Sequence, residues 1–329
     1  MGNGAKEIVW PSSEGFFSGD EKRGFMKRVK RQRKKERIEA AIKGNPVDRI
    51  PLVFWQSHSS SDDAQASWED MYHFYQETDT DMLVLPLVSL YDVKQTESGH
   101  ISLSIQSDRW KKEELYLNEL IEKVQGEAPV VWTMESPFSF LLSLEPKACE
   151  KYTSMQLKEM LGQLTDLACF LVRHVIELGA DGIRLRTKVM DYDVMDEDFY
   201  REYGKPYDVA VLSASSGWCD IFSLSGQSLM MDVLKNYPVD ILHRDSHGTL
   251  PTVEEMHVLS QKCIMGGFLA SSVMNGNKAE LTHDLYEMIK VTGGKRVILS
   301  PDRGLVENQS GMLSFIRSQK EEIEKEIIL

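Results

Sequence analysis

The chain contains little cysteine and no long apolar segment. Its 329 residues include four cysteines, and no two of them form a CxxC pair, so neither a disulfide framework nor a zinc knuckle is predicted. No stretch approaches the roughly 18–20 consecutive apolar residues that span a membrane, and the N-terminus lacks the apolar centre of a signal peptide. These absences predict a cytoplasmic protein with reduced thiols.

Charged residues are abundant but unevenly placed. The chain has a formal net charge of −13, yet residues 22–37 (KRGFMKRVKRQRKKER) hold ten of its 38 basic side chains. Such a run can contact nucleic acid or an anionic surface. The remaining chain is acidic and would repel a phosphate backbone, so we expect neither a nucleic-acid nor a membrane partner. The run is interpreted as a solvated helix that leads into the folded domain.

Short apolar runs alternate with longer amphipathic stretches after residue 37. Buried parallel strands are predicted at 51–55, 81–86, 129–134, 182–186, 219–224, 239–243, 263–268 and 296–301. Helical periodicity is found at 153–178, 196–213, 252–261, 278–291 and 312–328. Eight such units predict an α/β fold, a (β/α)8 TIM barrel formed by one domain over residues 38–329, after an N-terminal extension at 1–37. Residues 95–109 (QTESGHISLSIQSDR) interrupt the alternation and predict a hairpin inserted after the second strand.

Polar side chains gather where the predicted strands end. In barrels of this kind the chemistry lies at the carboxyl ends of the strands. The candidates at these ends are Trp55, Gln56, His58, Glu135, Arg186, Ser223, Ser225, His243, Arg244, Asp245, Asp302 and Arg303. Arg184 and Arg186 alternate along one strand and so share a face; if they point inward, they need partners such as Glu135.

Several segments resemble the uroporphyrinogen decarboxylase superfamily, which also contains the corrinoid-dependent methyltransferases. ERIEAAIKGNPVDRIPLVFW (36–55) is similar to the start of that family, and WTMESPFSFLLSL (132–144) to its third-strand segment. ELGADGIRLR (177–186) resembles its fourth strand, EDFYREYGKPY (197–207) the helix that follows, and RVILSPDRG (296–304) the eighth strand with its loop. The order and spacing of these segments imply the barrel fold of the family over nearly the whole chain.

The residues that carry the known chemistries of the superfamily are replaced. The decarboxylases hold propionate groups with arginines after the first strand, where this chain reads WQSHSSSDD, and they place an aspartate near the position of Val88. Many of the methyltransferases bind zinc at positions that Ser223, Ser225 and Arg303 occupy here. Hydroxyl groups are poor zinc ligands and guanidinium groups only donate hydrogen bonds, so we expect no zinc and no tightly bound cofactor.

The sequence HRDSH (243–247) follows the sixth predicted strand and resembles a cluster in other members of the superfamily. His243 with Asp245 can form a general base whose carboxylate fixes the tautomer, and His58 is the third candidate catalytic group. A metal site of His58, His243 and His247 is the lesser alternative. The remaining strand-end side chains are predicted to bind substrate.

Three functions remain open. The resemblance implies methyl transfer to or from a corrinoid; a partner protein would carry it, because no Asp-x-His-x-x-Gly loop is found. The alternative is a decarboxylase or related lyase that recognises a carboxylated, tetrapyrrole-like substrate through Arg186, Arg244 or Arg303. The third is a non-catalytic barrel that binds a ligand or partner through its rim and its basic N-terminal helix. The resemblance also implies a homodimer.

Overall fold

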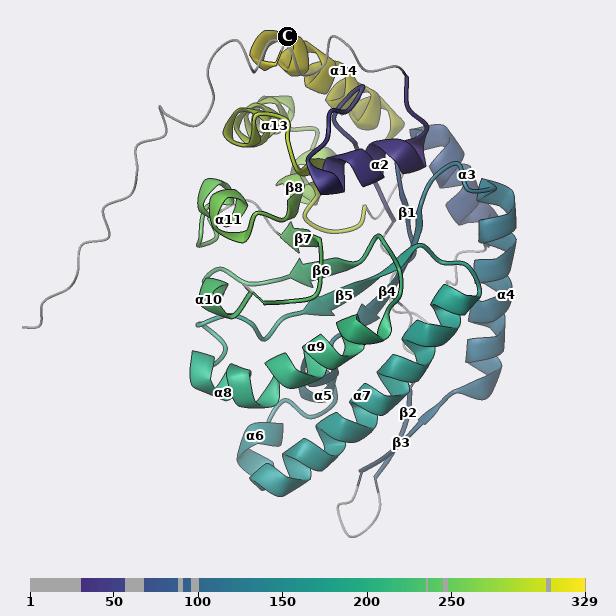
Figure 1. Ribbon diagram of the computed structural model, residues 1–329, viewed down its shortest axis with the longest axis vertical. Coiled ribbons are helices and arrows are strands. Elements are labelled where there is room, and N and C mark those ends of the chain that lie inside the picture. Colours follow the sequence, from purple (N-terminus) through teal and green to yellow (C-terminus); the bar gives the residue numbers. More distant parts are fainter. Residues whose placement is uncertain are drawn as a thin grey trace, which may run out of the picture.

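A seven-stranded parallel sheet forms the centre of the molecule. The computed structural model describes residues 31–56, 68–87, 91–95, 101–234, 236–244, 248–305 and 309–328. The strands pair in chain order: β1 (Leu83–Val84), β4 (Val130–Glu135), β5 (Gly182–Thr187), β6 (Ile221–Leu224), β7 (Ile241–Arg244), β8 (Cys263–Phe268) and β9 (Val297–Pro301). Helices surround the sheet (Figure 1). Nearly every residue of these strands is buried, which explains their continuously apolar sequences.

The first predicted strand, 51–55, departs from this regular pairing. It makes single parallel bridges to the β9 side, Leu52 with Leu299 and Gln56 with Leu305. Toward β1, the N–H groups of Leu52 and Phe54 donate to the side chains of Asp81 (2.9 Å) and Thr80 (2.9 Å) instead of to a backbone ladder. Within the described residues the sheet is therefore curled and TIM-barrel-like, and the prediction of eight regular strands in a closed barrel is confirmed only in part.

The five predicted helical stretches begin and end close to their predicted positions, and the structure has further helices that were not predicted. The helices of the outer layer are α3 (Trp68–Thr78), α4 (Ser107–Val124), α5 (Pro137–Leu144), α6 (Ala148–Lys151), α7 (Ser154–Glu177), α8 (Glu197–Tyr203), α9 (Lys205–Ala214), α10 (Met231–Leu234), α11 (Val253–Ser260), α12 (Ala270–Met274), α13 (Lys278–Thr292) and α14 (Ser310–Ile327). Thr153 and Thr252 begin α7 and α11 with capping boxes. The single helix predicted at 196–213 is two, because Gly204 ends α8 and Pro206 stands in the first turn of α9, where no N–H is required.

A hairpin follows β1, as predicted. Strand β2 (Tyr91–Gln95) pairs antiparallel with β3 (Ile101–Ile105), and Tyr91 lies opposite Ile105. The predicted boundaries of 95–109 are wrong by several residues, because the first arm begins at Tyr91 and α4 already starts at Ser107. Figure 1 shows this hairpin projecting beside α7, away from the central sheet.

Helix α2 (Lys34–Lys43) covers the amino end of the sheet, where Ile38 and Ile42 pack against apolar residues of the concave face. Residues 1–30 of the predicted extension lie outside the described part of the chain. Within α2, Lys34 and Arg37 are buried, so the basic run is not a solvated helix over this part. The helix also crosses the predicted boundary between residues 37 and 38.

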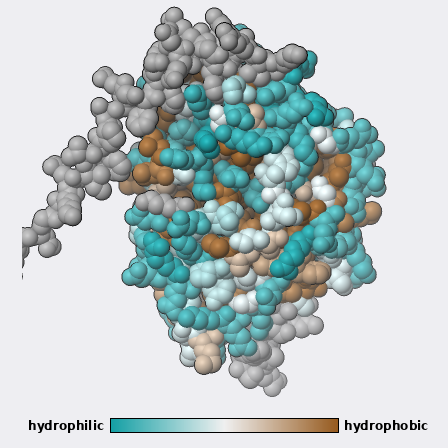
Figure 2. Space-filling view, viewed as in Figure 1, coloured by the Kyte–Doolittle hydropathy of each residue, from teal (hydrophilic) through white to brown (hydrophobic). Residues whose placement is uncertain are grey.

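One face of the molecule is drawn in Figure 2. It is mostly hydrophilic, with hydrophobic residues scattered between hydrophilic ones. Among the described residues, the structure contains no helix that is both long enough and apolar enough to cross a membrane.

Candidate active site

The concave face of the sheet changes from apolar to polar along the strands. Near the amino ends, Val131, Ile221 and Ile241 belong to one apolar cluster. Side chains two positions apart on a strand point to the same face, so Ser223 and His243 continue this face toward the carboxyl ends. Polar groups are thus concentrated at the end of the sheet where the sequence predicts the site.

A compact polar cluster, formed by Trp55, Arg184, Ser223 and His243, lies on this face. The hydroxyl group of Ser223 lies 2.8 Å from Nδ1 of His243, and Nη2 of Arg184 donates to the same hydroxyl oxygen at 3.2 Å. The ring of Trp55 packs edge-on against His243 and beneath the guanidinium of Arg184, whose Cζ lies 4.6 Å from the ring centroid. These four side chains come from residues 51–56, β5, β6 and β7, respectively.

The hydrogen bonds of His243 fix its tautomer. Nε2 lies 3.1 Å from the carbonyl oxygen of Pro301, which can only accept, so Nε2 carries the proton. Nδ1 is then an acceptor for the hydroxyl group of Ser223. Burial and the neighbouring charge of Arg184 hold the pKa of His243 well below its ordinary value. The imidazole is therefore neutral at physiological pH.

Arg184 is a buried cation that forms no ion pair with a carboxylate of the described residues. Its side chain has 6% exposure, and among the described residues Nε has no hydrogen-bond partner. Burial, with a smaller effect from Arg186, lowers the pKa of Arg184 to about 9. Sequence reasoning identified the face that Arg184 shares with Arg186 but did not include Arg184 in the site. The alternation of arginines in GIRLRT is the signal that could have identified it.

Glu135 and Arg186 lie beside this cluster. They are register partners on β4 and β5, and Arg186 in turn pairs with Ser223 on β6. Glu135 forms its ion pair with Lys188, at 3.0 Å, rather than with either predicted arginine. The side-chain oxygen of Gln56 is buried and has no partner among the described residues.

Other predicted residues take up local contacts. Arg244 follows His243, so its side chain points to the opposite face of the sheet, where it donates to the carbonyl groups of Thr249 (3.1 Å) and Pro251. Asp302 accepts from the N–H of Ala270 at 2.6 Å and forms an ion pair with Arg303 at 2.9 Å. The side chain of Ser225 forms no hydrogen bond with the described residues. The structure does not bring these four predicted residues into the polar cluster.

The remaining predicted residues, His58, Asp245 and His247, lie outside the described residues, so their roles stay predictions. The donor set that is described does not fit zinc. Ser223 already bonds His243 and Arg184, and the Arg303 guanidinium has no lone pair to offer. The described part of the chain holds no group of three His, Cys, Asp or Glu residues arranged for a metal ion.

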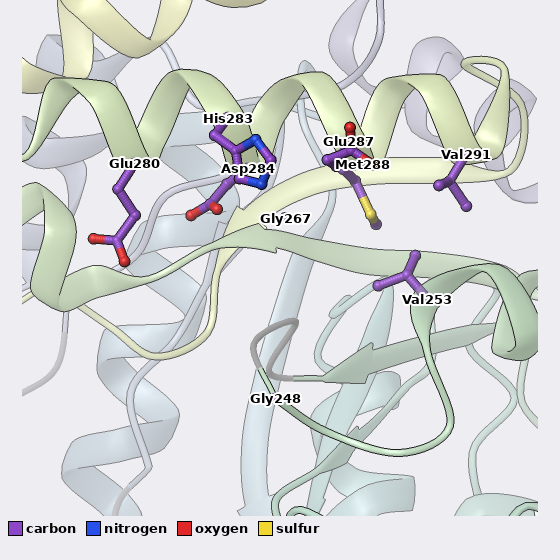
Figure 3. Close-up of a pocket in the computed structure, with 9 residues that line it drawn as sticks. All are labelled: Gly248, Val253, Gly267, Glu280, His283, Asp284, Glu287, Met288 and Val291. Atoms are coloured by element: carbon purple, nitrogen blue, oxygen red, sulfur yellow. The ribbon is translucent and has the colours of Figure 1, made fainter.

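A surface pocket of about 420 Å³ lies apart from this cluster (Figure 3). Helix α13 forms one wall, and Glu280, Asp284 and Met288 point from it toward the strand that carries Gly267. The lining is Gly248, Val253, Gly267, Glu280, His283, Asp284, Glu287, Met288 and Val291. This pocket contains none of the predicted site residues, so we place the candidate active site at the polar cluster.

Comparisons with known proteins agree with the fold. The sequence model of the family "Uroporphyrinogen decarboxylase (URO-D)" matches residues 116–310, more than half of the chain. No curated relative matches. The structure is similar to a methyltransferase from Methanosarcina mazei, with a TM-score of 0.70 at 16% identity, covering 88% of this chain and 98% of that one.

A second similar structure is a B12-independent methionine synthase from Shewanella sp. W3-18-1, in complex with selenomethionine. Its TM-score is 0.56 at 12% identity, and the match covers 84% of this chain and 98% of that one. At such identities the two structures show a shared fold. The match of the family model is stronger evidence than these structural similarities, because it compares sequences. It covers β4 to β9 and with them Arg184, Ser223 and His243. The chain belongs to the uroporphyrinogen decarboxylase (URO-D) family.

Proposed function

We propose that this protein transfers a methyl group to or from a corrinoid that a separate protein carries. Membership of the URO-D family and the similarity to a structure described as a methyltransferase support this proposal. The observation that carries it is the polar cluster, because Arg184, Ser223 and His243 form an enclosed polar surface where barrels hold substrates. The corrinoid supplies the methyl chemistry, and the protein has to bind and orient the second substrate.

The chain's own residues provide orientation and one path for a proton. Ser223 donates to Nδ1 of His243, so a proton can pass between the hydroxyl oxygen and the imidazole. Because the pKa of His243 is lowered, the imidazole is a weak base and holds such a proton poorly. The neutral ring is therefore expected to act mainly as a hydrogen-bond acceptor that orients the hydroxyl group of Ser223. Acid–base catalysis by His243 with Asp245 or His58 stays a prediction.

This proposal includes no zinc. In the zinc-dependent members that the sequence resembles, the metal would bind a thiol as its thiolate. Here the corresponding positions hold Ser223, Ser225 and Arg303, whose chemistry does not suit that role. The second substrate is therefore expected to be held by hydrogen bonds and charge.

The test is methyl exchange with methylcobalamin as the probe, followed by the change in corrinoid absorption. Candidate methyl acceptors carrying a thiol or an amine are added in turn to the purified chain. Turnover is expected in the native protein and its loss in His243→Ala, whose circular dichroism should match that of the native protein. Lys158→Met, which removes an exposed ion pair with Glu202, is the control and should retain turnover. Unchanged turnover in His243→Ala would refute the assigned site.

A carboxy-lyase is the second candidate, favoured by one observation. Arg184 and Arg186 stand at alternate positions of β5, and cations on a concave face suit a carboxylated substrate. Release of CO2 from uroporphyrinogen or another polycarboxylate would support this activity over methyl transfer. Absence of both activities, with ligand binding retained, would instead identify a non-catalytic binding protein.

We further infer that residues 51–56 act as the first strand of an eight-stranded (β/α)8 barrel. The N–H of Val53 donates to the carbonyl group of Leu299 on β9 at 2.8 Å. The N–H of Asp81, just before β1, donates to the carbonyl group of Leu52 at 3.0 Å. The segment therefore forms backbone hydrogen bonds toward both edges of the sheet. This arrangement holds Trp55 against Arg184 and His243. Packing of Trp55 is therefore part of the proposed site.

A further inference from the structure

The inner face of β5 carries an unusual excess of positive charge. Arg184 and Arg186 stand at alternate positions of β5, so their side chains leave the strand on the same side, and Lys188 follows directly after the strand ends. Among the described residues, Lys188 alone of these three forms an ion pair, with Glu135 at 3.0 Å. The two arginines therefore have no described carboxylate partner, although the protein as a whole has a net charge of −13.

The geometry around Arg184 leaves hydrogen-bonding capacity unused. One face of the guanidinium lies over the ring of Trp55, 4.6 Å from the centroid. The donors lie in the plane of the group, perpendicular to this stacking direction. Of these, Nη2 donates to the hydroxyl group of Ser223 at 3.2 Å and lies 3.4 Å from Nδ1 of His243, whereas Nε has no partner among the described residues. The edge that includes Nε and Nη2 is the one with which arginine binds both oxygens of a carboxylate.

Packing alone does not account for these charges. A buried guanidinium without an anion loses its hydration, and neutral partners such as the Ser223 hydroxyl group, the His243 imidazole and the Trp55 ring restore only part of that cost. Burial also lowers the pKa of Arg184 to about 9. An apolar side chain of similar length would fill the same space without this cost. The charge therefore indicates a requirement other than stability.

We propose that Arg184 and Arg186 form a subsite that binds an oxyanion group of the substrate, in the first instance a carboxylate. Arg186, which is half-buried, lies toward the carboxyl end of β5, and Arg184 is the deeper of the two. The inference rests on the proposed function only in placing a small substrate at this end of the sheet. It holds whether the reaction there is methyl transfer or decarboxylation.

Binding is tested on the purified chain without any corrinoid. Succinate and inorganic phosphate are titrated at constant ionic strength, which separates specific binding from screening. Binding is followed by calorimetry and by tryptophan fluorescence. Because the chain has six tryptophans, Trp55→Phe identifies the part of the signal that arises beside Arg184. Saturable binding of succinate is expected; tighter binding of phosphate would assign the oxyanion to a phosphorylated substrate instead.

The variants separate a binding role from a structural one. Arg184→Met and Arg186→Met should each weaken binding about 10- to 100-fold, the loss expected for a charge-assisted hydrogen bond. Arg184→Lys keeps the positive charge but loses the paired N–H donors of the guanidinium, so it should also weaken anion binding. The control Lys158→Met should leave anion binding unchanged. Without ligand, Arg184→Met should unfold at the same temperature as the native chain or at a higher one.

Absence of anion binding to the native chain, or equal binding by Arg184→Met, would overturn the proposal. A large loss of thermal stability in ligand-free Arg184→Met would also overturn it, by showing that Arg184 is required for folding. Because no reaction is measured, failure of the methyl-transfer assay would leave this result standing.

Discussion

The aspartate Asp81 connects the first barrel segment to the rest of the sheet, and its replacement by asparagine should be strongly destabilising. Its side chain is fully buried. One oxygen accepts from Arg37 at 2.7 Å, and both accept from Arg49, at 2.7 and 2.8 Å. The side chain also accepts from the N–H of Leu52 at 2.9 Å. An asparagine would present N–H groups to these donors and leave two guanidinium groups without their shared anion.

Removing one partner of a buried ion pair costs about 3–5 kcal/mol, because the remaining charge stays desolvated. We therefore expect Asp81→Asn to lower the free energy of unfolding by about that amount, measured by urea denaturation at unchanged m-value. Asp79→Asn is the matched control. Asp79 is 57% exposed and forms ion pairs with Lys34 and Arg317, so its loss should cost about 0–1 kcal/mol. Equal effects of the two substitutions would refute this reasoning.

Three further predictions concern titration and backbone geometry. Burial raises the pKa of Asp208 to about 7, so the stability that its protonated carboxyl group contributes should be lost as pH rises from about 4 to 7, and the difference in urea unfolding between the native chain and Asp208→Asn should follow this loss. Burial and Arg184 lower the pKa of His243, so the stability that its neutral imidazole contributes should be lost as pH drops below about 6.5, with a slope opposite in sign to that of Asp208. The difference between the native chain and His243→Gln should show this slope of about 1.4 kcal/mol per pH unit, and its absence would contradict a neutral imidazole. Gly226 has a φ of 144°, and a Cβ there would clash with the carboxylate of Asp191, so Gly226→Ala should cost at least about 1–3 kcal/mol in thermal or urea unfolding. A native-like midpoint for Gly226→Ala would show that the loop adjusts.

Several elements could be predicted from the sequence because their causes are local. Thr153 and Gln156 form the capping box that starts α7, and both lie within four residues of each other. Continuous apolar runs predicted β4 to β9 because strands covered on both faces require them. Alternation along β5 also predicts that Arg184 and Arg186 share one face.

Other features depend on contacts between distant segments. Residues 51–56 do not form a regular strand because the side chains of Thr80 and Asp81 accept hydrogen bonds from the N–H groups of Phe54 and Leu52. In a regular sheet these N–H groups would donate to the backbone of the neighbouring strand. No local pattern at 51–56 signals this competition. The inserted hairpin was similarly predicted in kind but not in extent, because the pairing of Tyr91 with Ile105 fixes its first arm.

The sequence by itself determined most of the strands, the starts of α7, α8, α11, α13 and α14, and the end of the sheet where polar side chains gather, since periodicity and caps act over a few residues. Only the tertiary structure decided which of those side chains meet. It places Ser223 2.8 Å from Nδ1 of His243 and turns Arg244, the next residue, to the other face. It also buries Arg184 over Trp55, from a segment far away in the chain. Burial and the distances between strands set the charge of these groups, and neither quantity is a property of a local sequence pattern.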